Sequence, residues 1–282
     1  MTRPRRMTSD WKTSATPLVR HGFTVVELLV AISIIGMLMA LILPAVQHSR
    51  ESARGAQCRS QLKQLGQALH NFEASHSRFP AGDDFQNFEL HSWCTRILPY
   101  IDQANLYANY DWTKPWDDSA GNAGVTGTKL PLFVCPSSPQ RQNGPIDYGG
   151  NFGSSQTGLI PGLLIGEAWE SGALVSINVG GALGRIDPTR LGEFADGLSS
   201  TFLVLECTER QFPSGYWGCG GNTMGIEYPI NSHPEGETIK SNHPQGGHTL
   251  FCDGHVAFYS NSTDLKLLGR LSTRAGDEVA QP

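Results

Sequence analysis

The feature that most constrains this chain is an apolar run near its N-terminus. From Phe23 to Leu43, a stretch of 21 residues, the sequence carries one charged side chain, Glu27. An α-helix rises about 1.5 Å per residue, so a run of this length spans the roughly 30 Å hydrocarbon core of a bilayer. The sequence therefore predicts a membrane-spanning helix over residues 23–43.

The residues before this run carry an excess of positive charge. They include one acid, Asp10, and these basic residues: Arg3, Arg5, Arg6, Lys12 and Arg20. Basic residues stay on the cytoplasmic side of a membrane. A secretory signal has a shorter apolar region, about 7–15 residues, followed by a small-residue cleavage site, and no such site follows Leu43. We expect a basic leader over residues 1–22, a cytoplasmic N-terminus, and a single-pass protein of the inner membrane whose C-terminal domain is periplasmic.

Glu27 is the unusual residue of the run, because a carboxylate inside a membrane helix is costly and requires a partner. Together with the basic leader, Gly22, Phe23 and Glu27 resemble the type III signal of type IV pilins and type II secretion pseudopilins. The resemblance implies that a prepilin peptidase cleaves between Gly22 and Phe23, and that Phe23 is then N-methylated. It also implies that Glu27 neutralises the new N-terminal amine of a neighbouring subunit, since opposite charges attract strongly in a low-dielectric medium. The alternative is a plain membrane anchor that happens to contain a Glu.

The helix is expected to continue beyond the membrane. Pro44 should bend it, and apolar residues then recur at helical spacing: Cys58, Leu62, Leu65, Leu69 and Phe72. We predict an amphipathic continuation over residues 44–77, an exported globular domain over residues 78–274, and a tail over residues 275–282.

The sequence of the exported part predicts a loop-rich α+β domain. The chain has 32 Gly and 17 Pro, a composition that indicates many turns. Residues 201–205 have the composition of a buried strand, and residues 130–134 of a second, shorter one. Asp253-Gly254 between the apolar runs 249–252 and 256–259 predicts a β-hairpin, and residues 263–271 form an amphipathic helix. The predicted fold class is therefore α+β: a pilin-like long N-terminal helix packed on an antiparallel β-sheet.

Charge and cysteine content narrow the function. The full chain has a net charge of -5, and loss of the basic leader makes the exported part more acidic, which argues against nucleic-acid binding. None of the six cysteines forms a Cys-x-x-Cys pair, so a zinc ribbon is not indicated. Disulfides can persist after export, but their connectivity stays open.

A second resemblance covers nearly the whole exported part. Nine residues separate His243 from Asp253-Gly254, which is similar to the His-x9-Asp-Gly element of the DUF1559 family of prepilin-type proteins, found mainly in planctomycete-like bacteria. The similarity extends to Arg78-Phe79-Pro80 and to residues 133–137 and 148–153. His255 departs from the family pattern, in which a small polar residue is expected. The function of the family is itself inferred largely from the N-terminal signal.

Several residues have a possible chemical role as well as a plain structural one. A metal site of His243, His248, Asp253 and His255 is conceivable, but hydrogen bonding of His243 and Asp253 to loop backbone is favoured. Major pseudopilins often hold calcium, which suggests Asp196 and Asp253 as weak oxygen ligands. No catalytic motif is present, and the acids beside Cys207 would blunt that thiol. We expect no enzyme activity and no required cofactor.

The sequence thus leaves three classes of function. The first is a pilin-like structural subunit of a type II secretion pseudopilus or type IV pilus-like filament. Its partners are a prepilin peptidase/methyltransferase and other pilin-like subunits, contacted through the N-terminal helix. The second is a membrane-tethered periplasmic module that binds a glycan or protein through loops containing Trp112, Trp116 and Trp217. The third is an anchored metal-dependent hydrolase.

Overall fold

The computed structural model describes residues 24–84, 91–139, 141, 143–154, 172–174, 176–177, 188–210, 215–233 and 238–275. The chain divides into two units, Met1–Ser49 and Arg50–Pro282, and helix α1, Val25–His76, contributes to both. The predicted leader, Phe23 and most of the predicted tail lie outside the described residues.

A capping box begins helix α1 in the N-terminal unit. The backbone N and the hydroxyl of Thr24 donate hydrogen bonds to Oε2 of Glu27 at 2.9 and 2.8 Å, and the Glu27 N–H lies 3.3 Å from the Thr24 hydroxyl oxygen. This reciprocal bonding between the N-cap and the third helical residue satisfies donors that the first turn leaves unpaired. The helix continues through Pro44, and the bend expected there stays a prediction.

The apolar side chains of this first unit face outward. Val25, Met37 and Leu41 are 73%, 70% and 68% exposed, and the 18-residue stretch of highest hydropathy is not buried at all. It is long and apolar enough to cross a membrane. Exposed apolar surface of this extent indicates contact with lipid or with other chains.

In the C-terminal unit, helix α1 packs its apolar stripe into the core. Cys58, Leu62, Leu65 and Leu69 are fully buried and Phe72 is 8% exposed, which confirms the stripe predicted from the sequence. Each buried leucine contributes about 1.5–3 kcal/mol through removal of apolar surface from water.

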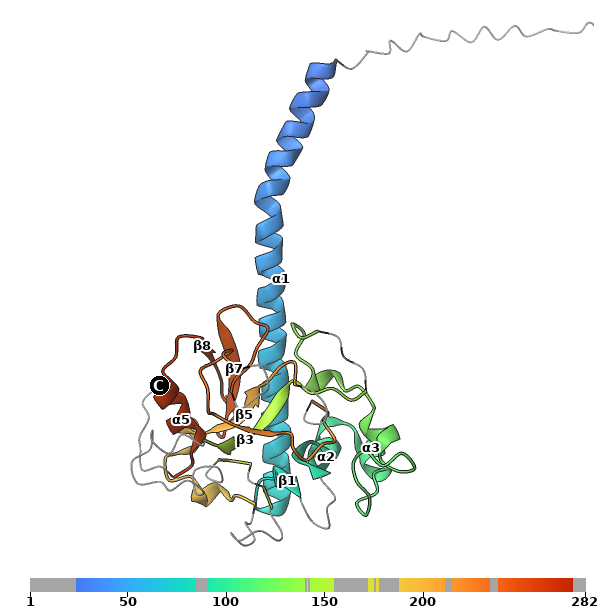
Figure 1. The fold of residues 1–282 in the computed structure, drawn as a ribbon, viewed down its shortest axis with the longest axis vertical. Coiled ribbons are helices and arrows are strands. Elements are labelled where there is room, and N and C mark those ends of the chain that lie inside the picture. Colours follow the sequence, from blue (N-terminus) through green and yellow to red (C-terminus); the bar gives the residue numbers. More distant parts are fainter. Residues whose placement is uncertain are drawn as a thin grey trace, which may run out of the picture. The chain divides into compact units, whose positions relative to one another are not determined.

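The main sheet of this unit has five strands in the order β6-β3-β5-β7-β8. Figure 1 labels four of them, β3, β5, β7 and β8. Their bounds are β3 Tyr148–Gly153, β5 Phe202–Glu206, β6 Thr223–Gly225, β7 Gly246–Phe251 and β8 Val256–Ser260. The sheet is antiparallel apart from the β3–β6 pair, which is parallel. The α+β class is confirmed, with a mixed sheet where an antiparallel one was expected, because β6 reaches β3 from a distant part of the chain.

The predicted hairpin is present as β7 and β8. Gly254 has φ +88° in the turn, a left-handed conformation that glycine adopts without steric cost. The N–H of Gly254 donates to the Phe251 carbonyl at 3.0 Å, and the N–H of Phe251 donates to the His255 carbonyl at 2.9 Å.

The two faces of the main sheet carry different layers. Helix α1 packs with Val204 and Leu250 in one core cluster. Helix α5, Leu265–Ser272, packs with Phe202 and Leu205 in the other. Successive side chains of a strand alternate between faces, so Glu206 at the end of β5 lies on the α1 side.

The remaining elements are short. A three-stranded sheet has the order β2-β1-β4, and its strands are β1 Asp83–Asp84, β2 His91–Ser92 and β4 Ser176–Ile177. The helical turns are α2 Trp93–Ile97, η2 Leu98–Ile101, α3 Ala104–Ala108, α4 Ala123–Thr126, η3 Pro131–Phe133, η4 Leu191–Glu193 and η5 Leu198–Ser200. The predicted strand at 130–134 is wrong, because Pro131 has no N–H to donate to a sheet and instead starts the 3-10 turn η3.

Candidate functional site

The C-terminal unit buries a group of four potential metal ligands: Cys58, Cys135, Glu206 and His243. Their ligand atoms all lie within 4.8 Å of one another, and all four residues are buried. Within the part of the chain that the structure describes, this is the one such group of three or more His, Cys, Asp or Glu residues. We call it the thiol–histidine cluster.

Four separate segments deliver these side chains. Cys58 belongs to the apolar stripe of α1. Cys135 follows η3, and its backbone N–H donates to Oδ2 of Asp147 at 2.9 Å. Glu206 is the last residue of β5. His243 lies in the loop before β7, where its N–H donates to the Ser241 hydroxyl at 3.0 Å.

His243 is held from both sides of its ring. Its Nδ1 lies 2.7 Å from Oε1 of Glu51, while Nε2 lies 3.4 Å from Sγ of Cys135 and 3.7 Å from Oε1 of Glu206. Burial by itself lowers the pKa of this ring. The bond to the Cys135 thiol, the charge of Glu206 and the bond to Glu51 outweigh burial and raise the pKa to about 9.

Glu51 ties the ring to the first helical turns of this unit. It also accepts a 3.0 Å hydrogen bond from the Ser137 hydroxyl and forms an ion pair with Arg54. Burial raises the pKa of Glu51, but the bonds to His243, Arg54 and Ser137 outweigh it, so the net shift is downward. The carboxylate is therefore available as a charged acceptor for the His243 Nδ1–H.

Glu206 is a fully buried acid with two fixed donors. The Ser241 hydroxyl donates to Oε1 at 2.8 Å, and the His248 backbone N–H donates to Oε2 at 2.9 Å. The side-chain Nδ1 of His248 lies 3.5 Å from Oε2 and has no hydrogen-bond partner although it is buried. These donors hold the carboxylate in one orientation toward the thiols.

The two thiols lie deep in the cluster. Sγ of Cys58 is 3.3 Å from the Tyr148 hydroxyl, which donates to Oε1 of Gln61 at 2.9 Å. Contact with the Cys58 thiol, together with burial, raises the pKa of Cys135. Both sulfurs are thus shielded from water and positioned by neighbouring polar groups.

The structure separates the histidines that the sequence placed together. His243 and His248 are neighbours, with ring centroids 5.0 Å apart. Asp253 and His255 instead pair with each other at the hairpin turn, with Oδ1 and Nδ1 2.6 Å apart. The four residues therefore do not converge on one point. The backbone N–H of Asp196 donates to the Arg274 carbonyl, and the ligand group above includes neither Asp196 nor Asp253.

Sequence reasoning missed most of the cluster. It identified His243 as a candidate ligand, but it placed Cys58 in the apolar stripe of the helix. No sequence motif around Cys135 or Glu206 indicates a metal site. Cys207, considered as a nucleophile, is buried in the core cluster on the α5 side of the sheet, and burial raises its pKa. The missing signal was spatial, since Cys135 and His243 are 108 residues apart.

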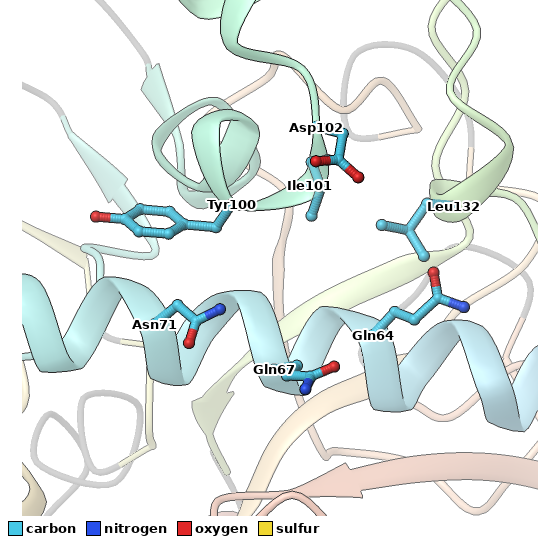
Figure 2. A pocket seen from close by; sticks show the side chains of 7 residues that line it. All are labelled: Gln64, Gln67, Asn71, Tyr100, Ile101, Asp102 and Leu132. Carbon is cyan, nitrogen blue, oxygen red and sulfur yellow. The ribbon is translucent and has the colours of Figure 1, made fainter.

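The C-terminal unit also has a groove of about 280 Å³. Figure 2 shows amide side chains of α1 on one side, facing Tyr100 and Leu132 on the other. Its lining consists of Gln64, Gln67, Asn71, Tyr100, Ile101, Asp102 and Leu132. The groove offers neutral hydrogen-bonding groups and the carboxylate of Asp102.

The tryptophans considered for ligand stacking are largely packed. Trp217 is fully buried and Trp116 is 6% exposed. Trp112 is half-buried and makes edge contacts with Tyr110 and His91, while the Arg96 guanidinium lies 5.1 Å from its ring centroid. The contacts of these three rings are therefore with the protein itself, and they stabilise the loops.

Comparison with known proteins identifies the family. The sequence profile of the family described as "Protein of unknown function (DUF1559)" matches residues 47–225 and 212–266. The chain belongs to the DUF1559 family. The profile of the prokaryotic N-terminal methylation motif matches residues 19–43 of this DUF1559 protein.

A curated relative points in the same direction. The competence protein ComGC of Halalkalibacterium halodurans is 33% identical over 63 residues, which cover 22% of the DUF1559 chain and 62% of the relative. The chain thus spans less than two thirds of the length of this relative. No solved structure matches. The methylation motif and this relative support a pilin-like, prepilin-type protein, and the exposed apolar helix fits a membrane anchor.

Proposed function

We propose that this protein is a pilin-like structural subunit that is processed between Gly22 and Phe23 and N-methylated at Phe23. It then assembles through its N-terminal helix into a type II secretion pseudopilus or type IV pilus-like filament. The observation that carries this proposal is the combination of the methylation motif with a fully exposed apolar helix. Its work is assembly and contact, and not turnover.

The exposed helix supports assembly on physical grounds. Before extraction, lipid covers the apolar side chains of α1 between Val25 and Leu43. In a filament, the same surface packs against equivalent helices, so the apolar contact is exchanged and not lost. A helix that served one folded unit alone would bury this surface inside it.

In this proposal Glu27 pairs with a neighbouring subunit, and the capping box determines which of its carboxylate oxygens is free to do so. Both bonds from Thr24 go to Oε2, and the second carboxylate oxygen can accept a bond from the N-terminal amine of a neighbouring subunit. The cap holds the carboxylate at the start of the helix. The pairing of two opposite charges in lipid then stabilises one register of adjacent helices.

The direction of insertion follows from the basic leader. Positive charge before the apolar run keeps the N-terminus in the cytoplasm, so the prepilin peptidase and methyltransferase act at the cytoplasmic face of the inner membrane. The C-terminal unit is then exported to the periplasm. There it contacts other subunits or the proteins that the filament moves.

Mass spectrometry of protein purified from its native membranes tests the processing step. The expected N-terminal peptide begins with N-methyl-Phe23 and lacks residues 1–22. A Gly22→Leu variant serves as the matched control, because it keeps the apolar helix and should retain the leader. Recovery of the wild-type chain with its leader attached contradicts the proposal and leaves a plain membrane anchor. Crosslinking in the native cell then identifies the filament that the subunit joins.

A further inference from the structure

The thiol–histidine cluster has the donors of a transition-metal site. Thiolates and an imidazole are ligands of zinc, and a carboxylate completes a four-ligand set. Calcium and magnesium prefer oxygen ligands alone, so two sulfurs disfavour them. The chemistry of Cys58, Cys135, Glu206 and His243 therefore selects a borderline divalent cation.

The distances are those of a tetrahedral site that closes slightly on binding. With Zn–S bonds of about 2.3 Å and Zn–N or Zn–O bonds of about 2.0–2.2 Å, tetrahedral ligands lie roughly 3.3–3.8 Å apart. Nε2 of His243 lies 3.4 Å from the Cys135 sulfur and 3.7 Å from the Glu206 oxygen. Every other pair of ligand atoms lies within 4.8 Å. Small rotations of the side chains bring all four donors to one centre.

A carboxylate already orients the histidine. Glu51 accepts the Nδ1–H of His243 at 2.7 Å, which directs Nε2 at the cluster. Metal-bound histidines usually donate their second N–H to such a carboxylate, which fixes the tautomer and strengthens the ligand. Ser241 and the His248 N–H hold Glu206 in the same way. The cluster has an outer shell as well as ligands.

Burial supplies the last argument. Glu206 is 0% exposed, and its carboxylate lies within 4.8 Å of the buried thiols of Cys58 and Cys135. Its ion-pair contacts among the described residues are with His243 and His248. A buried acid beside thiols is electrostatically unfavourable unless a cation compensates it, and without a metal the protonated ring of His243 is that cation. A divalent ion compensates the acid and makes thiolates stable.

We propose that Cys58, Cys135, Glu206 and His243 bind one zinc ion in a closed structural site. Zinc displaces the two thiol protons and the Nε2 proton of the His243 imidazolium to solvent, and four protein ligands leave no open position for a substrate. The ion joins α1, the segment after η3, the end of β5 and the loop before β7. The family's His-x9-Asp-Gly element then joins two structural parts, a zinc ligand and the turn that sets the register of β7. The inference does not depend on filament assembly.

The test uses the full-length chain in detergent, purified under reducing conditions and titrated with Zn²⁺ or Co²⁺ alone. We expect one ion per chain. The Co²⁺ form should show the intense visible bands of a tetrahedral centre and a thiolate-to-cobalt band in the near ultraviolet. His243→Gln and Cys135→Ser should lose stoichiometric binding. Cys252→Ala is the matched control, because Cys252 is equally buried but lies outside the cluster, and it should bind as the wild type does.

The wild-type spectrum keeps the test decisive if a ligand variant fails to fold. Absence of stoichiometric metal, or a Co²⁺ spectrum without a thiolate band, overturns the proposal. So does equal binding by a folded His243→Gln chain. Detection of a Cys58–Cys135 disulfide in protein isolated from its native cell also overturns it, because an oxidised pair cannot supply two thiolates.

Discussion

At the residue scale, Glu27 has one observed role and one proposed role, and substitution can separate them. It caps α1 through Thr24 within its own subunit, and the proposed function gives it a second partner in the neighbouring subunit. The sequence suggested the second task alone, because a capping box is easily overlooked at the start of an apolar run. A variant that removes the charge while keeping the cap distinguishes the two.

Glu27→Gln should leave the subunit inserted and folded but abolish its co-assembly. Glutamine at the third helical position still completes a capping box, whereas it cannot neutralise an amine in lipid. The measurement is the fraction of the variant recovered in sheared filaments or in crosslinked helix pairs. Thr24→Val is the control, since it removes the cap hydroxyl and keeps the charge, and it should assemble. Normal assembly by Glu27→Gln contradicts the charge-pairing role.

A second prediction at this scale concerns Glu51, which orients His243. Glu51→Gln should lower zinc affinity by about 10–100-fold without loss of the one-ion stoichiometry, as expected for a residue that acts on a ligand from behind. Competition with a chromophoric chelator measures the affinity. Glu73→Gln, an acid farther along α1 that has no part in the cluster, should have no effect. Complete loss of binding would instead make Glu51 a ligand.

At the scale of elements, the local signals predicted more than the distant ones. The stripe on α1, the hairpin at Asp253-Gly254 and helix α5 each depend on residues within a few positions of one another, and all three are present. The parallel β3–β6 pair and the thiol–histidine cluster depend on segments far apart, such as those of Cys135 and His243, which are 108 residues apart. The spacing of residues in a single sequence does not show which distant segments lie in contact in the fold.

The stripe on α1 gives a stability prediction for the C-terminal unit. Leu65→Ala should lower the free energy of unfolding by about 2–5 kcal/mol, because a fully buried leucine leaves a cavity on truncation. Lys63→Ala, on the exposed side of the same turn, should change it by less than about 0.5 kcal/mol. Urea denaturation of the full chain in detergent measures both. Similar values for the two variants would contradict the packing of this half of α1 on the sheet.

The turn between β7 and β8 gives a second prediction about the stability of the C-terminal unit. Gly254→Ala should destabilise the unit by roughly 1 kcal/mol or more, because alanine resists the left-handed conformation that φ +88° demands. Gly192→Ala is the control, since a Cβ at Gly192 meets nothing within 4 Å and the backbone there is ordinary. The same denaturation experiment reads both. Equal stability of the two variants would show that the turn adopts another conformation.

At the scale of the whole molecule, the two units meet different requirements with one helix. The first unit exposes its apolar side chains, while the second encloses a core and the thiol–histidine cluster. The sequence predicted this division from the change in pattern along α1, from continuous apolar residues to a stripe. It could not predict that the same helix supplies Cys58 to a buried site.

Zinc should therefore stabilise the C-terminal unit as a whole. A ligand that binds the native state at about one hundred times its Kd adds about 2.7 kcal/mol, and for a unit of this size each kcal/mol raises Tm by roughly 2–4 °C. Heating the full chain with Zn²⁺ and with a chelator should thus separate the transitions by roughly 5–10 °C. Cys252→Ala should show the same separation, because it still binds the ion that the chelator removes. His243→Gln should show none, because it binds no ion. A Tm that is the same in Zn²⁺ and chelator for the wild-type chain would mean that the four segments hold together without a metal, and that packing of α1 on the sheet suffices to fix the site.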